Sequence, residues 1–391
     1  MFIIILVLNF IVCFLFSCAV IRHFLSERPT PYVALYESFV VACILFATET
    51  WFFIEGLSVF NALKTPEPLA LLYFLSFLIL ITGIFCLRKS LQNLVNYVNV
   101  PVDIFVRNFV ILIMVLIILP LIFVSIYYPP CTADSMSYHL PRILHWIQNG
   151  NIAIYPSNYP RQLFYQPFAE YLVLPCELFV GNDYFDNTIQ IIALIGVFCL
   201  LALLVRYFGG GGRCQILACL LTLSAPIVIF EAPTTQTDII TTFFFLAFVY
   251  FGLKLSTFQS KPLLRTETIF YTICMGITLG LGLNTKVSIV TFEIPFCCWF
   301  GLQYLKTYRK KVILIYGLLV LGFLVFNVPY FIRNAQICGH IFGPIEGQNG
   351  MRNLRFGPDV IFSNAVRNIG MQLRIPNETV NQYNKNFLIR L

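Results

Sequence analysis

Residues 105–127 read FVRNFVILIMVLIILPLIFVSIY, and this stretch decides the class of fold. Arg107 is its one charged residue and lies near its start. A helix crosses the hydrocarbon core of a bilayer with about 20 predominantly apolar residues. Because the backbone must satisfy its own hydrogen bonds in lipid, we predict that this stretch is a transmembrane helix.

Runs of the same kind occur along the whole chain of 391 residues. They cover residues 2–21, 33–54, 69–88, 105–127, 187–207, 214–230, 239–256, 268–285, 288–305 and 312–331. The chain is 59% hydrophobic and 11% charged, whereas a soluble domain carries about 25% charged residues. This composition excludes an ordinary soluble globule, a disordered chain and a secreted disulfide scaffold. We predict an all-α polytopic membrane protein with about ten transmembrane helices.

The basic residues indicate how the chain is oriented. No basic residue precedes the first run, and Arg22 and His23 follow it, which places the N-terminus outside. The cytoplasmic connections then hold most of the 25 Lys and Arg residues, including the cluster Lys306, Arg309, Lys310 and Lys311. The net charge of +7 is therefore a sign of topology and not of nucleic-acid binding. We expect a multi-pass protein of the cytoplasmic (inner) membrane whose functional site faces the outer, periplasmic side.

This orientation divides the chain into three regions. They are three N-terminal transmembrane helices (residues 1–104), a transmembrane core that includes a long outer loop at 128–186 (residues 105–331), and an extracytoplasmic tail (residues 332–391). Residues 164–181 are apolar enough for a short span, but a crossing there would move the basic cluster outside. We therefore predict that this segment is an interfacial helix on the outer surface.

A second amphipathic helix is predicted near the start of the outer loop. Its apolar face consists of Met136, Leu140, Ile143, Leu144 and Ile147. The opposite face consists of Ser135, Tyr138, His139, Arg142 and His145. We expect this helix to lie flat at the outer interface, with Trp146 in the aromatic belt.

Two carboxylates are predicted at the outer membrane boundary. Asp134 lies where the run 105–127 leads into the outer loop, and Asp238 opens the run 239–256. Each could cap a helix, or both could line a wet outer cavity in which Asp134 deprotonates a substrate hydroxyl. Lys286 is a rare cation on the same side, where it could pair with Glu293 or bind an anionic headgroup.

Five short motifs follow one another within residues 105–391. They are Asp134-Ser-Met-Ser-Tyr-His-Leu-Pro-Arg-Ile-Leu-His-Trp-Ile-Gln-Asn-Gly150, Arg161-Gln-Leu with Gln166-Pro, Thr235-Gln-Thr-Asp238, Gly282-Leu-Asn-Thr-Lys286, and Arg333-Asn with Phe342-Gly-Pro. In this order they resemble the GT-C superfamily of integral-membrane glycosyltransferases, which use polyprenyl-phosphate sugars. Within it, the chain looks like the uncharacterised bacterial branch of the protein-mannosyltransferase-like family 39 group.

The resemblance implies an outward-facing active site and roles for particular residues. Asp134 would be the catalytic base of an inverting transfer, and Asp238 would help to shape the donor or acceptor site. The remaining candidates would bind the substrates, the cations by stabilising the polyprenyl-phosphate leaving group: His139, Arg142, Arg161, Gln162, Gln236, Lys286 and Arg333. Better-known relatives carry Asp-Glu or Asp-Asp in the first loop. Ser135 follows Asp134 here, so neither a metal nor another cofactor is expected.

The predicted partners are thus a polyprenyl-phosphate-sugar donor, a lipid or glycan acceptor and the membrane, with no nucleic acid. Three alternatives stay open. A lipid-glycan flippase or transporter would also have about ten spans, but transporters place polar residues in mid-membrane. A surface-polysaccharide polymerase would also have a large outer loop, but it would depend on Arg-rich loops. Because the chain ends in the tail, where relatives continue with further spans, the third alternative is a truncated, inactive relative.

Overall fold

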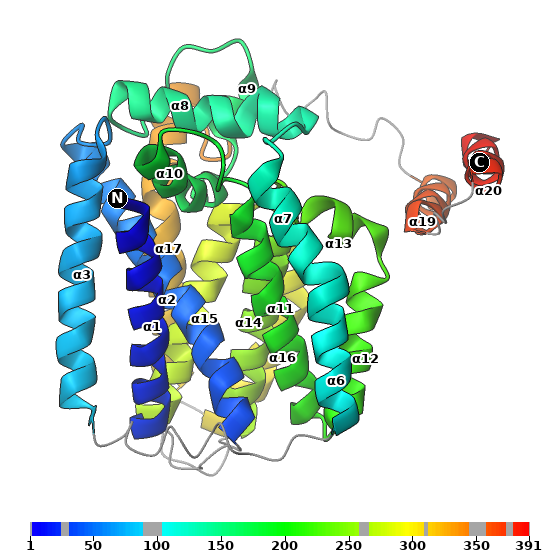
Figure 1. Cartoon of the computed structure of the whole chain (residues 1–391), viewed down its shortest axis with the longest axis horizontal. Helices are drawn as coiled ribbons and strands as arrows, with labels where there is room; N and C mark the ends of the chain where they lie inside the picture. Colours follow the sequence, from blue (N-terminus) through cyan, green and yellow to red (C-terminus); the bar gives the residue numbers. More distant parts are fainter. Residues whose placement is uncertain are drawn as a thin grey trace.

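The computed structural model describes residues 2–24, 31–88, 104–257, 266–308, 312–343, 357–372 and 378–390. Every regular element in these ranges is a helix, and the long helices stand side by side in one bundle (Figure 1). Arg309, Lys310 and Lys311 of the predicted cytoplasmic cluster lie outside the described residues.

The bundle is built from the apolar runs of the sequence. Its helices are α1 (Phe2–Phe24), α2 (Pro31–Val59), α3 (Pro66–Cys86), α6 (Ile104–Ile113), the π-helical turn η1 (Met114–Ile118), α7 (Leu119–Tyr127), α11 (Thr188–Tyr207), α12 (Gly212–Leu223), α13 (Pro226–Glu231), α14 (Asp238–Thr257), α15 (Thr266–Thr285), α16 (Ile289–Tyr308) and α17 (Val312–Cys338). Two further helices, α19 (Pro358–Gln372) and α20 (Glu378–Arg390), stand apart from the bundle (Figure 1).

Eight helices in the described ranges are long and apolar enough to cross a membrane. The all-α polytopic class is thereby confirmed, but the count of ten is not. The run 214–230 breaks before Pro226 into the shorter helices α12 and α13, because a proline disfavours helical geometry in the residue that precedes it. The run 288–305 forms α16, whose apolar character is interrupted by Glu293, Gln303 and Lys306.

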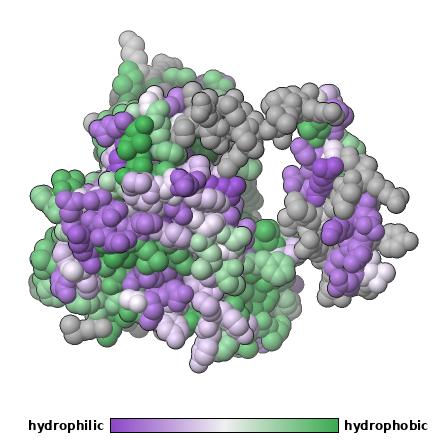
Figure 2. Space-filling view, turned by 90° about the horizontal axis from the view of Figure 1, so that it is seen from above, coloured by the Kyte–Doolittle hydropathy of each residue, from purple (hydrophilic) through white to green (hydrophobic). Residues whose placement is uncertain are grey.

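Residues 128–186 cover one end of the bundle, which we call the capped end (Figure 1). They form the π-helical turn η2 (Ser135–His139) and the helices α8 (Leu140–Asn149), α9 (Pro160–Phe164) and α10 (Phe168–Val180). Backbone contacts tie this cover to the connection between α2 and α3: the Leu63 N–H donates to the Gly150 carbonyl at 3.0 Å. Seen from this end, hydrophilic surface gathers in a band across the bundle, and hydrophobic surface borders it (Figure 2).

The helix α10 is a core element of the capped end. Its 13 residues are too few to cross a membrane, and Phe168, Tyr171 and Leu174 are fully buried. This short helix agrees with the prediction that segment 164–181 does not cross the membrane; its predicted place on the surface is wrong, because the helix is buried. A helix that is apolar on nearly every side is buried by its neighbours, and here the other short helices of the loop and the ends of the long helices bury it.

The helix α8 turns its polar face inward. His139, at the end of η2, and Arg142 are each 3% exposed. The predicted apolar face is divided, with Leu140 and Ile143 buried but Met136 and Leu144 exposed. Trp146 is buried against Tyr171, with 5.5 Å between the ring centroids, so its predicted place in an interfacial belt is wrong. The polar face can be buried because α10, which is distant in the sequence, supplies the Glu170 carboxylate as a partner for His139 and Arg142.

The bundle is held together by close helix contacts and by buried polar bonds. Glu49 of α2 accepts hydrogen bonds from Asn9 of α1 and Ser76 of α3, both at 2.8 Å. In lipid such bonds between helices contribute to association, because each polar group would otherwise be unsatisfied. The first three helices thus form one hydrogen-bonded unit, although the sequence offered no role for them.

Candidate functional site

A cavity of about 740 Å³ lies at the capped end, where five separate segments of the chain meet. We call it the capped-end cavity. Its walls come from η2 and the residue before it, from α9 and the start of α10, from the connection between α13 and α14, from the connection between α15 and α16, and from Phe342, which follows α17. Six of the nine predicted site residues line it: Asp134, His139, Arg161, Gln236, Asp238 and Lys286.

The side chain of Asp134 is free to face this cavity because another residue caps the helix. The Thr132 hydroxyl accepts the Ser135 N–H at 3.1 Å, and Asp134 makes no capping hydrogen bond. Gln236 donates to the Asp134 carboxylate at 3.3 Å, and Arg161 lies 3.5 Å from its other oxygen. The Asp134 side chain is 36% exposed, so water still reaches it.

The π-helical turn η2 helps to bring Asp134 and His139 to the same cavity. The Leu140 N–H bonds to the Ser135 carbonyl, five residues back. In an α-helix, five steps would rotate two side chains to different faces, whereas a π turn widens the helix and reduces this divergence. Both side chains consequently line the cavity.

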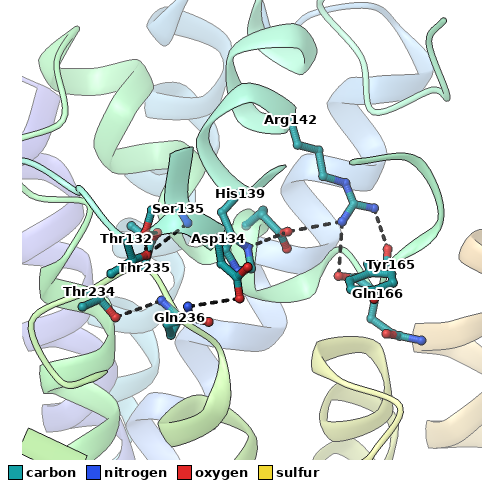
Figure 3. A network of polar contacts seen from close by, with 11 residues as sticks. Thr132, Asp134, Ser135, His139, Arg142, Tyr165, Gln166, Thr234, Thr235 and Gln236 are labelled. Atoms are coloured by element: carbon teal, nitrogen blue, oxygen red, sulfur yellow. Dashed lines mark hydrogen bonds and ion pairs between the residues drawn. The ribbon is translucent and has the colours of Figure 1, made fainter. Parts of the chain in front are cut away.

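A hydrogen bond links the connection between α13 and α14 to the start of η2, although the two lie a hundred residues apart in the sequence. The Thr235 hydroxyl donates to the Ser135 hydroxyl at 2.7 Å, in a buried position. Gln236, the next residue, then reaches Asp134 (Figure 3). These two hydrogen bonds help to hold Asp238, at the start of α14, in the wall of the cavity that Asp134 also lines.

Asp238 and Lys286 form the second ion pair of the cavity. The Lys286 ammonium lies 2.7 and 2.8 Å from the two carboxylate oxygens of Asp238. The two side chains are 45% and 37% exposed. The alternative that Lys286 pairs with Glu293 is not what the structure has. A pair this exposed contributes little to stability, which leaves the lysine available to an anion.

Glu231 is a lining residue that sequence reasoning missed. Burial and the nearby Asp238 carboxylate raise its pKa to about 7, against the partial counter-effect of Lys286. The signal was present, since Glu231 directly follows an apolar run at the same membrane boundary as Asp238. Besides Asp134, Asp238 and Glu170, the cavity wall therefore holds a carboxyl group whose pKa lies near neutral pH.

His139 and Glu170 of the cavity wall form a buried trio with Arg142, which lies behind the wall. The Glu170 carboxylate lies 3.0 Å from Nδ1 of His139 and 3.2 Å from the Arg142 guanidinium. Burial by itself raises the pKa of Glu170, but Arg142 and His139 outweigh it and hold that pKa below its usual value. Arg142 also donates to the carbonyls of Tyr165 and Gln166 (Figure 3), and it does not line the cavity.

Gln162 and Arg333 also lie outside the capped-end cavity. Gln162 donates at 2.7 Å to the carbonyl of Ser137, which lacks its helical partner because Pro141 has no N–H. Arg333 forms a two-point contact with Glu55 at 2.7 and 2.8 Å. Their predicted role in binding substrate stays a prediction, and the structure gives both side chains protein partners instead.

In the described ranges, no three His, Cys, Asp or Glu side chains gather where they could hold a metal ion. The cavity contains carboxylates, cations and aromatic rings instead. Searches of family models, of curated proteins and of solved structures found no match to this chain. The arrangement of the site is therefore interpreted from its own chemistry.

Proposed function

We propose that the chain is a membrane glycosyltransferase that moves a sugar from a polyprenyl-phosphate donor to an extracytoplasmic lipid, glycan or protein acceptor, with inversion at the anomeric carbon. The capped-end cavity is the proposed active site, and it faces outward from the cytoplasmic membrane. One observation carries the proposal: Asp134 and Asp238, about a hundred residues apart, line one cavity, and each is paired with a cation.

The two ion pairs suit a substrate that carries a phosphate. Arg161 and Lys286 are both about one-third exposed and are held by single carboxylates. The phosphate of the donor offers them a stronger anion and forms charge-assisted hydrogen bonds with both. When the sugar leaves, the negative charge that develops on the phosphate is stabilised by the same two cations.

Release of Asp134 from Arg161 supplies the base. The acceptor oxygen attacks the anomeric carbon, the bond from that carbon to the phosphate oxygen breaks, and its electron pair stays on the phosphate. The hydroxyl proton passes to the Asp134 carboxylate. An ionised Asp is a sufficient base here, because the forming bond makes the hydroxyl more acidic in the transition state.

The position of the site also favours this chemistry over transport. Asp238 begins the apolar helix α14, and Lys286 directly follows the apolar helix α15. A polyprenyl chain can thus stay in the membrane while its phosphate enters the cavity. A transporter would instead place its polar residues near the middle of the spans, on broken helices.

The test is transfer from a radiolabelled polyprenyl-phosphate sugar to endogenous acceptor in membranes. We expect Asp134→Asn to lower the rate by about 10²- to 10⁴-fold, the usual contribution of a general base. Asp359→Asn is the matched control, because Asp359 is exposed in α19 and does not line the cavity. Transfer at the wild-type rate by Asp134→Asn would remove Asp134 as the base.

A further inference from the structure

One ring nitrogen in the wall of the capped-end cavity has no partner. His139 is 3% exposed, and its Nδ1 lies 3.0 Å from Glu170. Its Nε2 is buried and has no hydrogen-bond partner in the part of the chain that the structure describes. A buried polar atom without a partner costs free energy, and His139 is a lining residue of the cavity. Nε2 of His139 is therefore available to form a hydrogen bond with a molecule bound in the cavity.

The charges of the buried trio decide whether Nε2 donates or accepts a hydrogen bond. Arg142 is cationic and Glu170 is anionic, so the pair is neutral as a whole. A protonated His139 would leave one uncompensated positive charge in a buried place, which is strongly unfavourable. With Glu170 accepting, the neutral imidazole carries its proton on Nδ1. Its Nε2 is then a hydrogen-bond acceptor and calls for a donor such as a hydroxyl.

The neighbours of His139 indicate which molecule supplies that hydroxyl. The ring of Tyr138 packs on the imidazole, with 4.1 Å between the centroids. The Arg161 guanidinium lies over the Tyr138 ring, 5.9 Å from the ring centroid. A phosphate held by Arg161 would therefore put the sugar attached to it beside Tyr138 and His139.

We propose that Nε2 of His139 accepts a hydrogen bond from a hydroxyl of the donor sugar, and that Glu170 is a positioning residue that holds His139 in the required tautomer. This inference rests on the proposed function and names the part of the substrate that the subsite recognises. His139 senses the sugar, whereas Arg161 and Lys286 bind the phosphate. His139 and Glu170 together thus make the protein bind a sugar-bearing lipid phosphate more tightly than the bare lipid phosphate.

The experiment compares two ligands that differ only in the sugar. Purified full-length protein in lipid nanodiscs is titrated with undecaprenyl phosphate and with undecaprenyl phosphates that carry mannose, glucose, galactose or arabinose. His139→Asn keeps an amide N–H for Glu170 and removes the acceptor that faces the cavity. His145→Asn is the matched control, because His145 lies six residues further on, in α8, and is not part of the cavity wall.

We expect wild type and His145→Asn to bind at least one sugar-bearing lipid more tightly than undecaprenyl phosphate. In His139→Asn this advantage should fall by about tenfold, the usual value of one such hydrogen bond, while the affinity for undecaprenyl phosphate stays the same. A general folding defect would lower both affinities together, so the ratio separates recognition from structure.

Two failures can be told apart. If wild type does not bind undecaprenyl phosphate at all, the proposed function fails and takes this inference with it. If undecaprenyl phosphate binds, but no sugar improves the affinity or His139→Asn keeps the advantage, the inference alone is overturned.

Glu170→Gln tests the tautomer without touching the imidazole. The new amide can donate to Nδ1 and thereby move the His139 proton to Nε2, which turns the acceptor into a donor. The same loss of the sugar advantage is expected. An unchanged affinity ratio in Glu170→Gln would remove Glu170 as the positioning residue.

Discussion

The charged residues of the capped end differ in how firmly the protein holds them. Arg142 and Glu170 are buried together, and every strong contact that they make is to the protein. The pairs Asp134 with Arg161 and Asp238 with Lys286 line the cavity, and all four side chains are at least one-third exposed. The first group stabilises the fold of the capped end, whereas the second can exchange partners when an anion enters.

Removal of one member of the buried pair should therefore destabilise the protein. Arg142→Met leaves the Glu170 carboxylate with His139 as its remaining partner, and an uncompensated buried charge costs about 3–5 kcal/mol. We expect a clear fall in the apparent melting temperature in detergent, measured by tryptophan fluorescence. The double variant Arg142→Met/Glu170→Gln should recover part of the loss, because the buried charge is gone. Equal melting temperatures of Arg142→Met and wild type would contradict the buried pair.

Glu231 should make stability depend on pH. Its pKa of about 7 in the folded protein exceeds the usual value of 4.5, so the folded protein binds more protons than the unfolded chain between these two values. Stability then falls as the pH rises through that window. In Glu231→Gln this part of the pH dependence should disappear. The check is the melting temperature of both proteins from pH 4.5 to pH 8, and parallel curves would exclude the shift.

At the scale of elements, α15 and α17 approach each other through glycines. A Cβ added at Gly322 would lie 2.5 Å from the carbonyl oxygen of Gly276, and one added at Gly280 would lie 2.5 Å from that of Gly322. Gly276 and Gly280 are four residues apart and so share one face of α15, the small-residue pattern that lets transmembrane helices pack closely. The sequence contains this pattern, but it does not name the partner helix.

Gly322→Ala should consequently force the two helices apart. The expected destabilisation is about 1–3 kcal/mol, as for other overpacked sites. Gly317→Ala in the same helix is the control, because a Cβ there meets no atom within 4 Å. Melting temperatures of the two variants provide the comparison. If both variants melt like wild type, the close contact between α15 and α17 does not exist.

The short helices of the capped end illustrate where sequence periodicity fails. The spacing of apolar residues correctly gives α8 two different faces, but it assigns the polar face to water. In the structure that face is buried, since Glu170 of α10 neutralises Arg142. Periodicity describes one helix at a time, so it cannot show that another helix supplies the opposite charge.

At the scale of the whole molecule, the proposed orientation can be tested with the protein's own cysteines. Cys131 is exposed at the capped end, and Cys214 is exposed in the first turn of α12, at the opposite end of the bundle. In intact cells a membrane-impermeant maleimide should label a variant that retains Cys131 alone and spare one that retains Cys214 alone. Lysed cells should show labelling of both, as the control for reactivity. The reverse pattern in intact cells would place the cavity on the cytoplasmic side.

The sequence by itself determined the class of the fold and the end of the membrane-spanning helices at which the site lies. Hydropathy is a property of each run, so the membrane-spanning helices could be predicted without knowing how they pack. Counting the runs also placed Asp134, Asp238 and Lys286 at one end of the bundle, where the structure has them. Only the tertiary structure decided which charges meet. Arg142 and Arg333 looked like Arg161 in the sequence, but packing shields their ion pairs from water more than the pair of Arg161 with Asp134. The ion pairs that packing leaves open to water are those of the cavity, Asp134 with Arg161 and Asp238 with Lys286.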